Sequence, residues 1–347
     1  MKIAIAQKNR PFSHQLGTWF LLPKTSWSVQ VFPTRLNFAN LEETQETFRV
    51  DFPWRGPLKE FTAQLDLESA SLSVFGMTQE GYMRYCLEAR GEGLWLDLDK
   101  APGKKVALSG SNFKEKRLSN KESMLLVSCF VCDSLNKERL SLGSHKAQEW
   151  SRMKERFDFK ELFPLWLQLS ALVPKTPHRP IESLKEHKRV ELLKAFTSFF
   201  LSTFKGVFVP RLCDEEHQGL PQEKTTIPLL SLLTESGRAI RSLFYQETDE
   251  LILLPCLPPE FSCGRMVSIQ THASHLLHFE WTKKALRRVV LTPATDGEVH
   301  LRLPKGITAC RLQTKGRVRS KLEVSKEGRL TLPLEQGSTL QLDRFLF

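Results

Sequence analysis

Apolar and polar residues alternate with a period of two through much of the first 145 residues, in short runs separated by turn-forming residues. The clearest runs are 27–32 and 61–68. Because successive side chains of a strand point to opposite faces, such runs predict strands with one buried face and one solvated face. Similar runs follow at 71–75, 83–89, 94–98, 105–108 and 124–132. Many short strands at this spacing predict an N-terminal antiparallel β-sandwich over residues 1–145.

The middle of the chain carries a helical pattern instead. Residues 147–172 predict a helix broken at Pro164, and residues 174–180 predict an extended linker, because each proline disfavours helix in the residue before it. Ser183 and Glu186 then form an S-x-x-E capping box at the start of a second helix.

An apolar stripe with three- and four-residue steps follows this capping box, and we expect it to be packed core rather than a ligand site. Its members are Leu184, Val190, Leu193, Phe196, Phe199, Phe200 and Phe204. Residues 229–245 predict a third helix. Together these segments predict a short α-helical region over residues 146–248.

Strand patterns return after residue 250 and continue to the end of the chain. The runs are 251–254, 266–271, 276–281, 287–291, 298–303, 308–314, 317–324, 329–332 and 339–342. They predict a C-terminal antiparallel β-sandwich over residues 249–347. The predicted fold class is therefore mainly β with a helical middle.

Composition narrows the class of protein. The chain has 347 residues, of which 41% are hydrophobic and 26% charged, as in globular proteins, and no run has the length of a transmembrane segment. The first ten residues contain too short an apolar run for a cleavable secretory signal. Seven cysteines, an odd number, suggest reduced thiols rather than a disulfide framework. We expect a cytoplasmic protein, with secretion by a route that needs no cleavable signal as the open alternative.

The formal net charge of +11 is concentrated in one part of the chain. Residues 283–329 contain thirteen Lys or Arg and four acids, a net charge of +9. Within this stretch Arg317, Arg319 and Lys321 alternate with other residues, so one face of a strand concentrates positive charge. We treat these three residues as candidates for binding a polyanion. The alternative is a solvated basic face that keeps the sheet soluble, and the aromatic residues needed to stack on nucleic-acid bases are missing here.

Cysteine and histidine groupings do not predict a metal site. Cys129 and Cys132 form a lone C-x-x-C inside an apolar run, and a structural zinc site would need two more ligands. We therefore expect core cysteines. His272, His275 and His278 follow at steps of three; on a strand, which the surrounding pattern favours, the first and last would share a face.

No other motif in the sequence identifies catalytic residues. The acidic segment 214–217, Asp-Glu-Glu-His, is the most loop-like polar cluster. The sequence contains no phosphate-binding loop, dinucleotide fingerprint, nucleophile elbow or H-E-x-x-H motif. Paired carboxylates for glycoside hydrolysis need no local motif, so the sequence does not assign catalytic residues. We expect neither a cofactor nor a metal.

Residues 236–246, 250–259, 261–265, 277–281 and 286–291 are similar in order and spacing to one junction of the α-L-fucosidase-like inverting glycoside hydrolases. In that family the last helix of an (α/α)6 barrel continues through an "LLPALP"-type segment into a C-terminal β-sandwich. The corresponding segment here is Leu253-Leu-Pro-Cys-Leu-Pro258. The resemblance covers about residues 235–310. A weaker similarity, at residues 17–23 and 27–36, is to the N-terminal β-sandwich of the same enzymes.

The resemblance implies a protein with a much smaller helical region than the enzymes of that family have. Only about 80 helix-forming residues separate the two β regions, too few for twelve barrel helices. The catalytic barrel is therefore expected to be largely absent, and no catalytic residue of the family carries over. The first hypothesis is a glycosidase-related, non-catalytic carbohydrate-binding or accessory protein. The alternatives are a basic adaptor that binds a polyanion or an acidic protein surface through residues 283–329, and a small glycoside hydrolase with a rearranged site.

Overall fold

The computed structural model describes residues 3–42, 46–132, 137–143, 146–179, 181, 193, 196–197, 200, 204–210, 228–314 and 317–347. For residues 204, 205, 210 and 317–319 it describes the backbone but not the side chain. The protein is mainly β, with several antiparallel sheets and, among these residues, three helices. This confirms the mainly β class with a helical middle. The domain boundaries at 145 and 248 remain a prediction.

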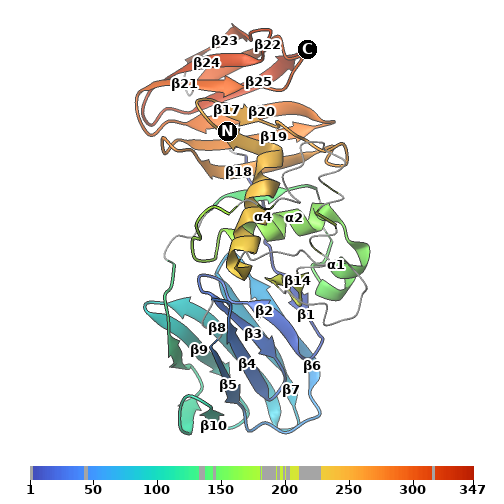
Figure 1. The fold of residues 1–347 in the computed structure, drawn as a ribbon, viewed down its shortest axis with the longest axis vertical. Coiled ribbons are helices and arrows are strands. Elements are labelled where there is room, and N and C mark those ends of the chain that lie inside the picture. The colour runs from blue at the N-terminus through green and yellow to red at the C-terminus, as the bar shows by residue number, and fades with distance from the viewer. Residues whose placement is uncertain are drawn as a thin grey trace.

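Two six-stranded sheets are built from the first 130 residues and form the lower part of Figure 1. One has the order β1-β6-β7-β8-β9-β12 and the other β11-β10-β5-β4-β3-β2. The bounds of the first sheet are Phe12–Ser13, Lys59–Asp66, Ser71–Thr78, Gly81–Arg90, Gly93–Lys100 and Glu122–Ser128. Those of the second are Lys116–Ser119, Lys105–Gly110, Thr47–Asp51, Arg35–Asn40, Trp27–Val31 and Thr18–Leu21.

The two sheets share one hydrophobic core because the apolar positions of their alternating strands face each other. Val29 and Val31 of β3 are fully buried in this core, as are Leu72 and Val74 of β7. An aromatic stack joins the sheets: the ring of Phe52, just after β5, lies 4.8 Å from the ring of Tyr85 on β8. Sequence alternation therefore predicted seven of these strands, β3, β6, β7, β8, β9, β10 and β12, each with a buried face. It did not predict β1, β2, β4, β5 or β11.

Three described helices connect the β regions: α1 (Trp150–Arg156), α2 (Phe159–Ser170) and α4 (Leu229–Phe244). The expected break at Pro164 is wrong, because Pro164 lies inside α2. The chain breaks earlier, at Phe157, whose φ of 46° ends α1 in the left-handed region. The side chain of Asp158 then accepts a hydrogen bond from the N–H of Lys160 and caps α2. Proline removes only one helical hydrogen bond, and burial of Pro164 against the core offsets that loss.

Part of the predicted apolar stripe is described, and that part is core. Leu193, Phe196 and Phe200 are buried, and the ring of Phe196 lies 5.0 Å from that of Phe163 on α2. The prediction of helix at Phe204 is wrong, because Phe204 lies in the strand β14 (Phe204–Lys205). The other members of the stripe, and the capping box of Ser183 and Glu186, lie outside the described residues. Residues 174–179 form neither helix nor strand, as the proline-rich sequence predicts.

The strands after α4 form a seven-stranded sheet and a four-stranded sheet, seen at the top of Figure 1. The seven-stranded sheet has the order β13-β18-β19-β20-β25-β22-β23. Its bounds are Arg139–Ser141, Gly264–Gln270, Leu276–Thr282, Ala285–Thr292, Leu340–Leu346, Ala309–Thr314 and Arg317–Glu323. The four-stranded sheet has the order β16-β17-β21-β24, with bounds Tyr245–Glu247, Leu251–Leu253, Gly297–Arg302 and Arg329–Leu334. The pair β14 (Phe204–Lys205) and β15 (Val209–Pro210) is separate.

Segments from the first half of the chain complete the seven-stranded sheet. Strand β13 pairs with β18 although more than 120 residues separate them along the sequence. Ile3 packs against Val267 of β18 and Val290 of β20, so the N-terminus lies beside these strands (Figure 1). Among the described residues no helix has the length and apolar character needed to span a membrane.

Candidate functional site

A cavity of about 1100 Å³ lies where α2 and α4 meet the β18–β19 end of the seven-stranded sheet. This volume is slightly above the range of roughly 300–1,000 Å³ that is typical of small-molecule sites. The lining comes from four segments distant in sequence, within 130–138, 167–176, 234–241 and 268–276. Its residues are Phe130, Cys132, Lys137, Glu138, Leu167, Ser170, Ala171, Val173, Pro174, Lys175, Thr176, Thr234, Gly237, Arg238, Arg241, Ser268, Gln270, Thr271, Ser274 and Leu276.

One face of helix α4 forms a wall of the cavity. Thr234, Gly237, Arg238 and Arg241 follow steps of three and four residues, which puts them on one face of the helix. All four line the cavity. The opposite side of α4 carries the apolar residues that pack into the core. Because the apolar side of the helix faces the core, its polar side faces the cavity.

The contact between α2 and α4 fixes the floor of the cavity. The indole N–H of Trp166 on α2 donates to Ser236 Oγ on α4 at 2.8 Å, and both groups are buried. One residue later, Gly237 lies against Ser170: a Cβ on Gly237 would be 2.0 Å from Ser170 Oγ. Glycine is therefore needed for the helices to approach this closely.

Glu138 and Arg241 join the segment before β13 to α4 through a two-point ion pair. Arg241 Nε donates to Glu138 Oε1 at 2.7 Å and Nη2 donates to Oε2 at 3.0 Å. The carboxylate is buried, and the guanidinium also lies over the ring of Tyr245, 4.6 Å from its centroid. Burial acts to lower the pKa of Arg241, but its hydrogen bonds with Glu138 outweigh this and raise the pKa above its usual range. The arginine is held charged and in place.

A second buried carboxylate, that of Glu235, holds the extended segment 174–179 against α4. It accepts hydrogen bonds from His178 Nδ1 at 2.8 Å and from the N–H of Arg179 at 3.0 Å, and pairs with Arg238. Nearby, the hydroxyls of Thr176 and Thr234 lie 2.7 Å apart. Glu138 and Glu235 are thus both bound by arginines of α4.

The remaining polar groups of the lining face the cavity without such partners. Lys137 and Lys175 are exposed and have no carboxylate partner in the described part of the chain. Ser268, Gln270 and Ser274 contribute hydroxyl and amide groups from the β18–β19 side. The arrangement provides hydrogen-bond donors and acceptors on both sides and an excess of positive charge.

Phe130 adds an apolar surface at the rim of this cavity. Its side chain is 71% exposed, the highest value among the large hydrophobic residues of the described chain. An exposed aromatic ring beside hydroxyl, amide and cationic groups suits a ligand with both polar edges and apolar faces.

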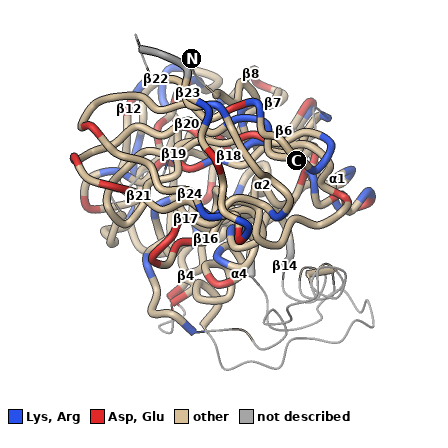
Figure 2. The backbone as a smooth tube through the Cα atoms, turned by 90° about the horizontal axis from the view of Figure 1, so that it is seen from above, with Lys and Arg blue, Asp and Glu red and all other residues tan. Residues whose placement is uncertain are grey.

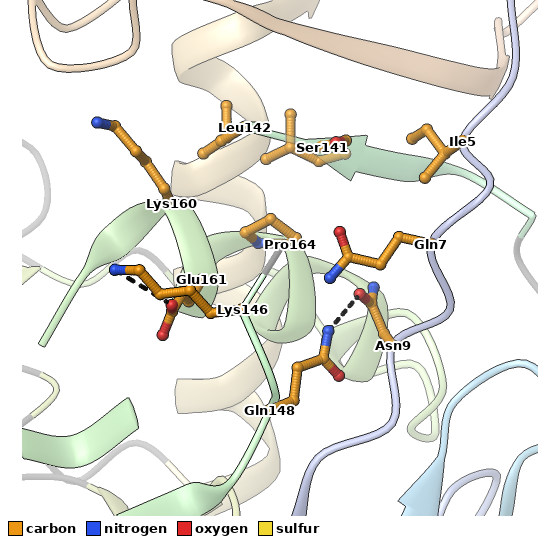
Figure 3. A pocket seen from close by; sticks show the side chains of 11 residues that line it. Ile5, Gln7, Asn9, Ser141, Leu142, Lys146, Gln148, Lys160, Glu161 and Pro164 are labelled. Carbon is orange, nitrogen blue, oxygen red and sulfur yellow. Dashed lines mark hydrogen bonds and ion pairs between the residues drawn. The ribbon is translucent and has the colours of Figure 1, made fainter. Parts of the chain in front are cut away.

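A much smaller cavity, of about 20 Å³, lies between the N-terminal segment, β13 and α2 (Figure 3). It has room for about one water molecule. Its polar side chains bind one another: Gln148 Nε2 donates to Asn9 Oδ1 at 3.4 Å, and Asn9 Nδ2 donates to Gln168 Oε1 at 2.6 Å. This amide network anchors the N-terminal segment to α2 and is structural.

A shallow groove on the N-terminal sheets is a third depression. Its lining includes His14, Leu16, Phe75 and Tyr82. His14 Nδ1 lies 3.0 Å from both the carbonyl of Phe61 and the hydroxyl of Thr62, so the imidazole is held by the sheet. The groove presents fewer polar groups than the large cavity.

The three polyanion candidates lie apart from the large cavity. Arg317, Arg319 and Lys321 belong to β23, at the end of the seven-stranded sheet opposite β13 and β18. Lys321 is exposed, whereas the side chains of Arg317 and Arg319 are outside the described part of the structure. The cavity and the basic strand are therefore two separate surfaces.

The basic stretch 283–329 is partly neutralised by acids from outside it. Arg288 pairs with Glu280 at 3.0 Å, Arg311 pairs with Asp343 at 2.6 Å, and Glu250 pairs with two arginines. Basic and acidic positions accordingly lie next to each other along the chain trace in Figure 2. The exposed cations without a carboxylate partner among the described residues are Lys283, Lys284, Arg287, Lys305, Lys321 and Lys326. The net charge of residues 283–329 alone did not reveal these ion pairs, because the acidic partners lie on strands outside that stretch.

The histidine prediction needs correction. His272 and His275 lie in the turn between β18 and β19, and only His278 lies on a strand. His275 is buried, and its Nδ1 accepts a hydrogen bond from the N–H of Ala294 at 3.1 Å. The turn interrupts the alternation, so the three imidazoles do not follow one strand.

Cys129 and Cys132 are half-buried and lie outside the helices and strands. Burial raises the pKa of the Cys129 thiol to about 11, which makes it a poor nucleophile at neutral pH. Among the described residues no cluster of three or more His, Cys, Asp or Glu side chains could hold a metal ion. The acidic segment 214–217 lies outside the described residues.

Among the lining residues, sequence reasoning considered only Cys132 as a candidate site residue, as part of the C-x-x-C pair. One signal was present: Glu235, Arg238 and Arg241 recur at three-residue steps within an otherwise apolar helix. Their partners Glu138 and His178 lie far away in sequence, so the contacts could not be derived from spacing.

No protein-family model matches the chain, and no curated protein matches it. Solved structures that share some similarity with it include the following two. The first is a GH127 β-L-arabinofuranosidase from Geobacillus stearothermophilus T6, 18% identical over 36% of this chain and 20% of that protein, with a TM-score of 0.21. The second is a glycoside hydrolase, 13% identical over 56% of this chain and 30% of that protein, with a TM-score of 0.20. The chain thus spans less than a third of either protein's length.

Proposed function

We propose that this chain is a glycosidase-related protein that binds carbohydrate in the cavity between α2, α4 and the β18–β19 turn and does not hydrolyse it. The observation that carries the proposal is the lining of the 1100 Å³ cavity. The similarity of residues 235–310 to a junction of glycoside hydrolases supports the same class. In this proposal the cavity lies where the three predicted domains, 1–145, 146–248 and 249–347, meet.

The chemistry of the lining suits a sugar. A saccharide presents hydroxyl groups around a ring with apolar C–H faces, and fixed donors and acceptors determine its orientation. The hydroxyls of Thr176 and Thr234 and the amide of Gln270 provide such groups from three different segments of the lining. Phe130 provides a ring against which an apolar sugar face can pack.

The carboxylates at the cavity favour binding over hydrolysis. Glycoside hydrolysis uses two carboxyl groups that flank the scissile bond, one of them carrying a proton to the leaving group. Glu138 and Glu235 each accept hydrogen bonds from an arginine of α4, so their oxygens are already occupied by side chains of the protein itself. Neither is placed to act as a general acid.

The test is a binding screen with neutral and acidic oligosaccharides, read by thermal shift and confirmed by calorimetry. We expect at least one saccharide to raise the melting temperature. Lys175→Ala and Gln270→Ala, both at exposed cavity positions, should each weaken its binding at least fivefold. Lys284→Ala, an exposed lysine outside the cavity, should leave the affinity unchanged.

Three results would contradict the proposal. One is that no saccharide stabilises the protein. Another is that binding is lost in Tyr82→Ala but kept in the cavity variants, which would move the site to the groove on the N-terminal sheets. The third is release of product from the bound saccharide, abolished by Glu138→Gln, which would favour the alternative of a small hydrolase with a rearranged site.

A further inference from the structure

Six charged residues lie in register across the seven-stranded sheet, one on each of six neighbouring strands. Residues directly opposite each other on neighbouring strands share a face, so these side chains form one row. In order across the sheet they are Arg265, Glu280, Arg288, Asp343, Arg311 and Lys321.

The charges of this row alternate in sign except at its end. Arg288 pairs with Glu280 at 3.0 Å, and Arg311 forms two hydrogen bonds to Asp343, at 2.6 and 2.8 Å. The next position is Lys321, a second cation directly opposite Arg311. Like charges opposite each other destabilise a sheet, and Lys321 has no carboxylate partner among the described residues.

Lys321 lies on an open edge. Strand β23 is the last strand in the order of the sheet, so one of its sides has no neighbouring strand in the described chain. The N–H of Val324 donates to the carbonyl of Thr308 at 2.9 Å, which sets the alternation of the ladder. By that alternation Ser320 and Leu322 bond to β22, and the main-chain N–H and C=O of Lys321 point away from it.

The open edge therefore presents both a main-chain donor and acceptor and a positive charge lacking its counter-ion. A carboxylate on an added strand, opposite Lys321, would supply the counter-ion that this lysine lacks among the described residues. The sequence of β23, Arg-Val-Arg-Ser-Lys-Leu-Glu, carries a net charge of +2, so two copies of this edge repel each other. Charge thus selects an acidic partner over a second copy of the chain.

We propose that the open edge of β23 binds an extended, acidic segment of a partner protein as an additional antiparallel strand of the seven-stranded sheet. Main-chain hydrogen bonds supply affinity in such strand addition, and side chains at alternate positions supply selectivity. This surface is independent of the carbohydrate cavity, which lies at the other end of the same sheet.

The probe is a labelled synthetic peptide in which glutamate alternates with threonine and valine, measured by fluorescence anisotropy. Lys321→Arg should keep the affinity, because it keeps the charge. Lys321→Glu should weaken binding at least tenfold through repulsion. Lys321→Pro should weaken it similarly, because it removes the outward N–H and leaves the β22 hydrogen bonds in place. Lys104→Glu makes the same charge change at an exposed turn elsewhere and should alter binding less than twofold.

Hydrogen exchange distinguishes binding as an added strand from electrostatic attraction between the acidic peptide and the basic strand. In the complex the main-chain amides of 317–323 should exchange more slowly, and a peptide with the same charge but interrupted by prolines should neither bind nor protect them. Circular dichroism and saccharide binding of each variant show whether it is folded and whether the cavity is intact.

Three outcomes would overturn the proposal: no binding of the alternating peptide to the folded wild-type protein, equal binding of the proline-interrupted peptide, or peptide binding that Lys321→Glu leaves unchanged. Dimerisation through β23 in place of peptide binding would show that a second copy occupies the edge and would also contradict it.

Discussion

Ser170 and Gly237 lie in contact where α2 meets α4, with room for no side chain on Gly237. This approach sets the distance between the helices and so the width of the cavity whose walls both residues line. A small residue here is a packing requirement and not a preference for flexibility, because Gly237 sits in the interior of a helix, where glycine by itself is unfavourable.

Gly237→Ala should therefore lower the free energy of unfolding by about 2 kcal/mol, because overpacking outweighs the better helix propensity of alanine. Urea denaturation measures this. The double variant Gly237→Ala/Ser170→Gly removes the clashing side chain and should recover a large part of the loss. A single variant as stable as the wild type would show that the helices can separate without cost.

Arg241→Met should cost about 3 kcal/mol of folding free energy, because it leaves the buried carboxylate of Glu138 without its counter-charge. Thermal or urea denaturation gives the value. Glu138→Gln combined with Arg241→Met removes both charges and should be more stable than Arg241→Met alone. Arg287→Ala, an exposed arginine without a carboxylate partner in the described chain, is the control and should change stability by less than about 0.5 kcal/mol. Equal losses in Arg241→Met and in this control would refute the buried ion pair.

Low pH should remove the contribution of the Arg311–Asp343 ion pair to the stability of the fold. Hydrogen bonds from Arg311, opposed in part by burial, hold the pKa of Asp343 below its usual range. A carboxyl group with a lowered pKa in the folded state stabilises the fold above its unfolded pKa, about 3.9, and this contribution disappears as the pH falls through the folded pKa. Asp343→Asn should thus melt at a lower temperature than wild type at pH 7, and the difference should shrink below about pH 4. Melting curves from pH 7 to pH 2.5 provide the measurement, and a difference that stays constant with pH would contradict the ion pair.

Cysteine reactivity should follow burial. The pKa of Cys129 and that of Cys310 are both raised to about 11, with burial as the main cause, whereas Cys263 is exposed. Because the thiolate is the reactive form, iodoacetamide at pH 7.5 should modify Cys263 well before the other two. Peptide mapping by mass spectrometry follows each site, and the three rates should converge in denaturant. Faster modification of Cys129 than of Cys263 in the folded protein would mean that Cys129 is not protected.

Sequence patterns predicted most of the elements because their causes are local. The two-residue alternation at 61–68 and 276–281 became β6 and β19, and the apolar steps at 229–245 became α4. The errors also had local causes. Pro164 did not break α2, because core packing outweighed its missing hydrogen bond, and a turn at 271–275 interrupted the histidine-bearing strands.

The sequence by itself determined the alternating strands, the helical middle and the total charge of +11, since each depends on residues close together or on their number. Only the tertiary structure decided which charges meet. Glu138 lies 103 residues from Arg241, and Asp343 lies 32 from Arg311, so no spacing rule brings them together. Sheet order likewise left Lys321 on an open edge, and the packing of helices on that sheet assembled a cavity from four separated segments. Strand pairing and helix packing depend on buried surfaces from the whole chain, which a local pattern does not contain.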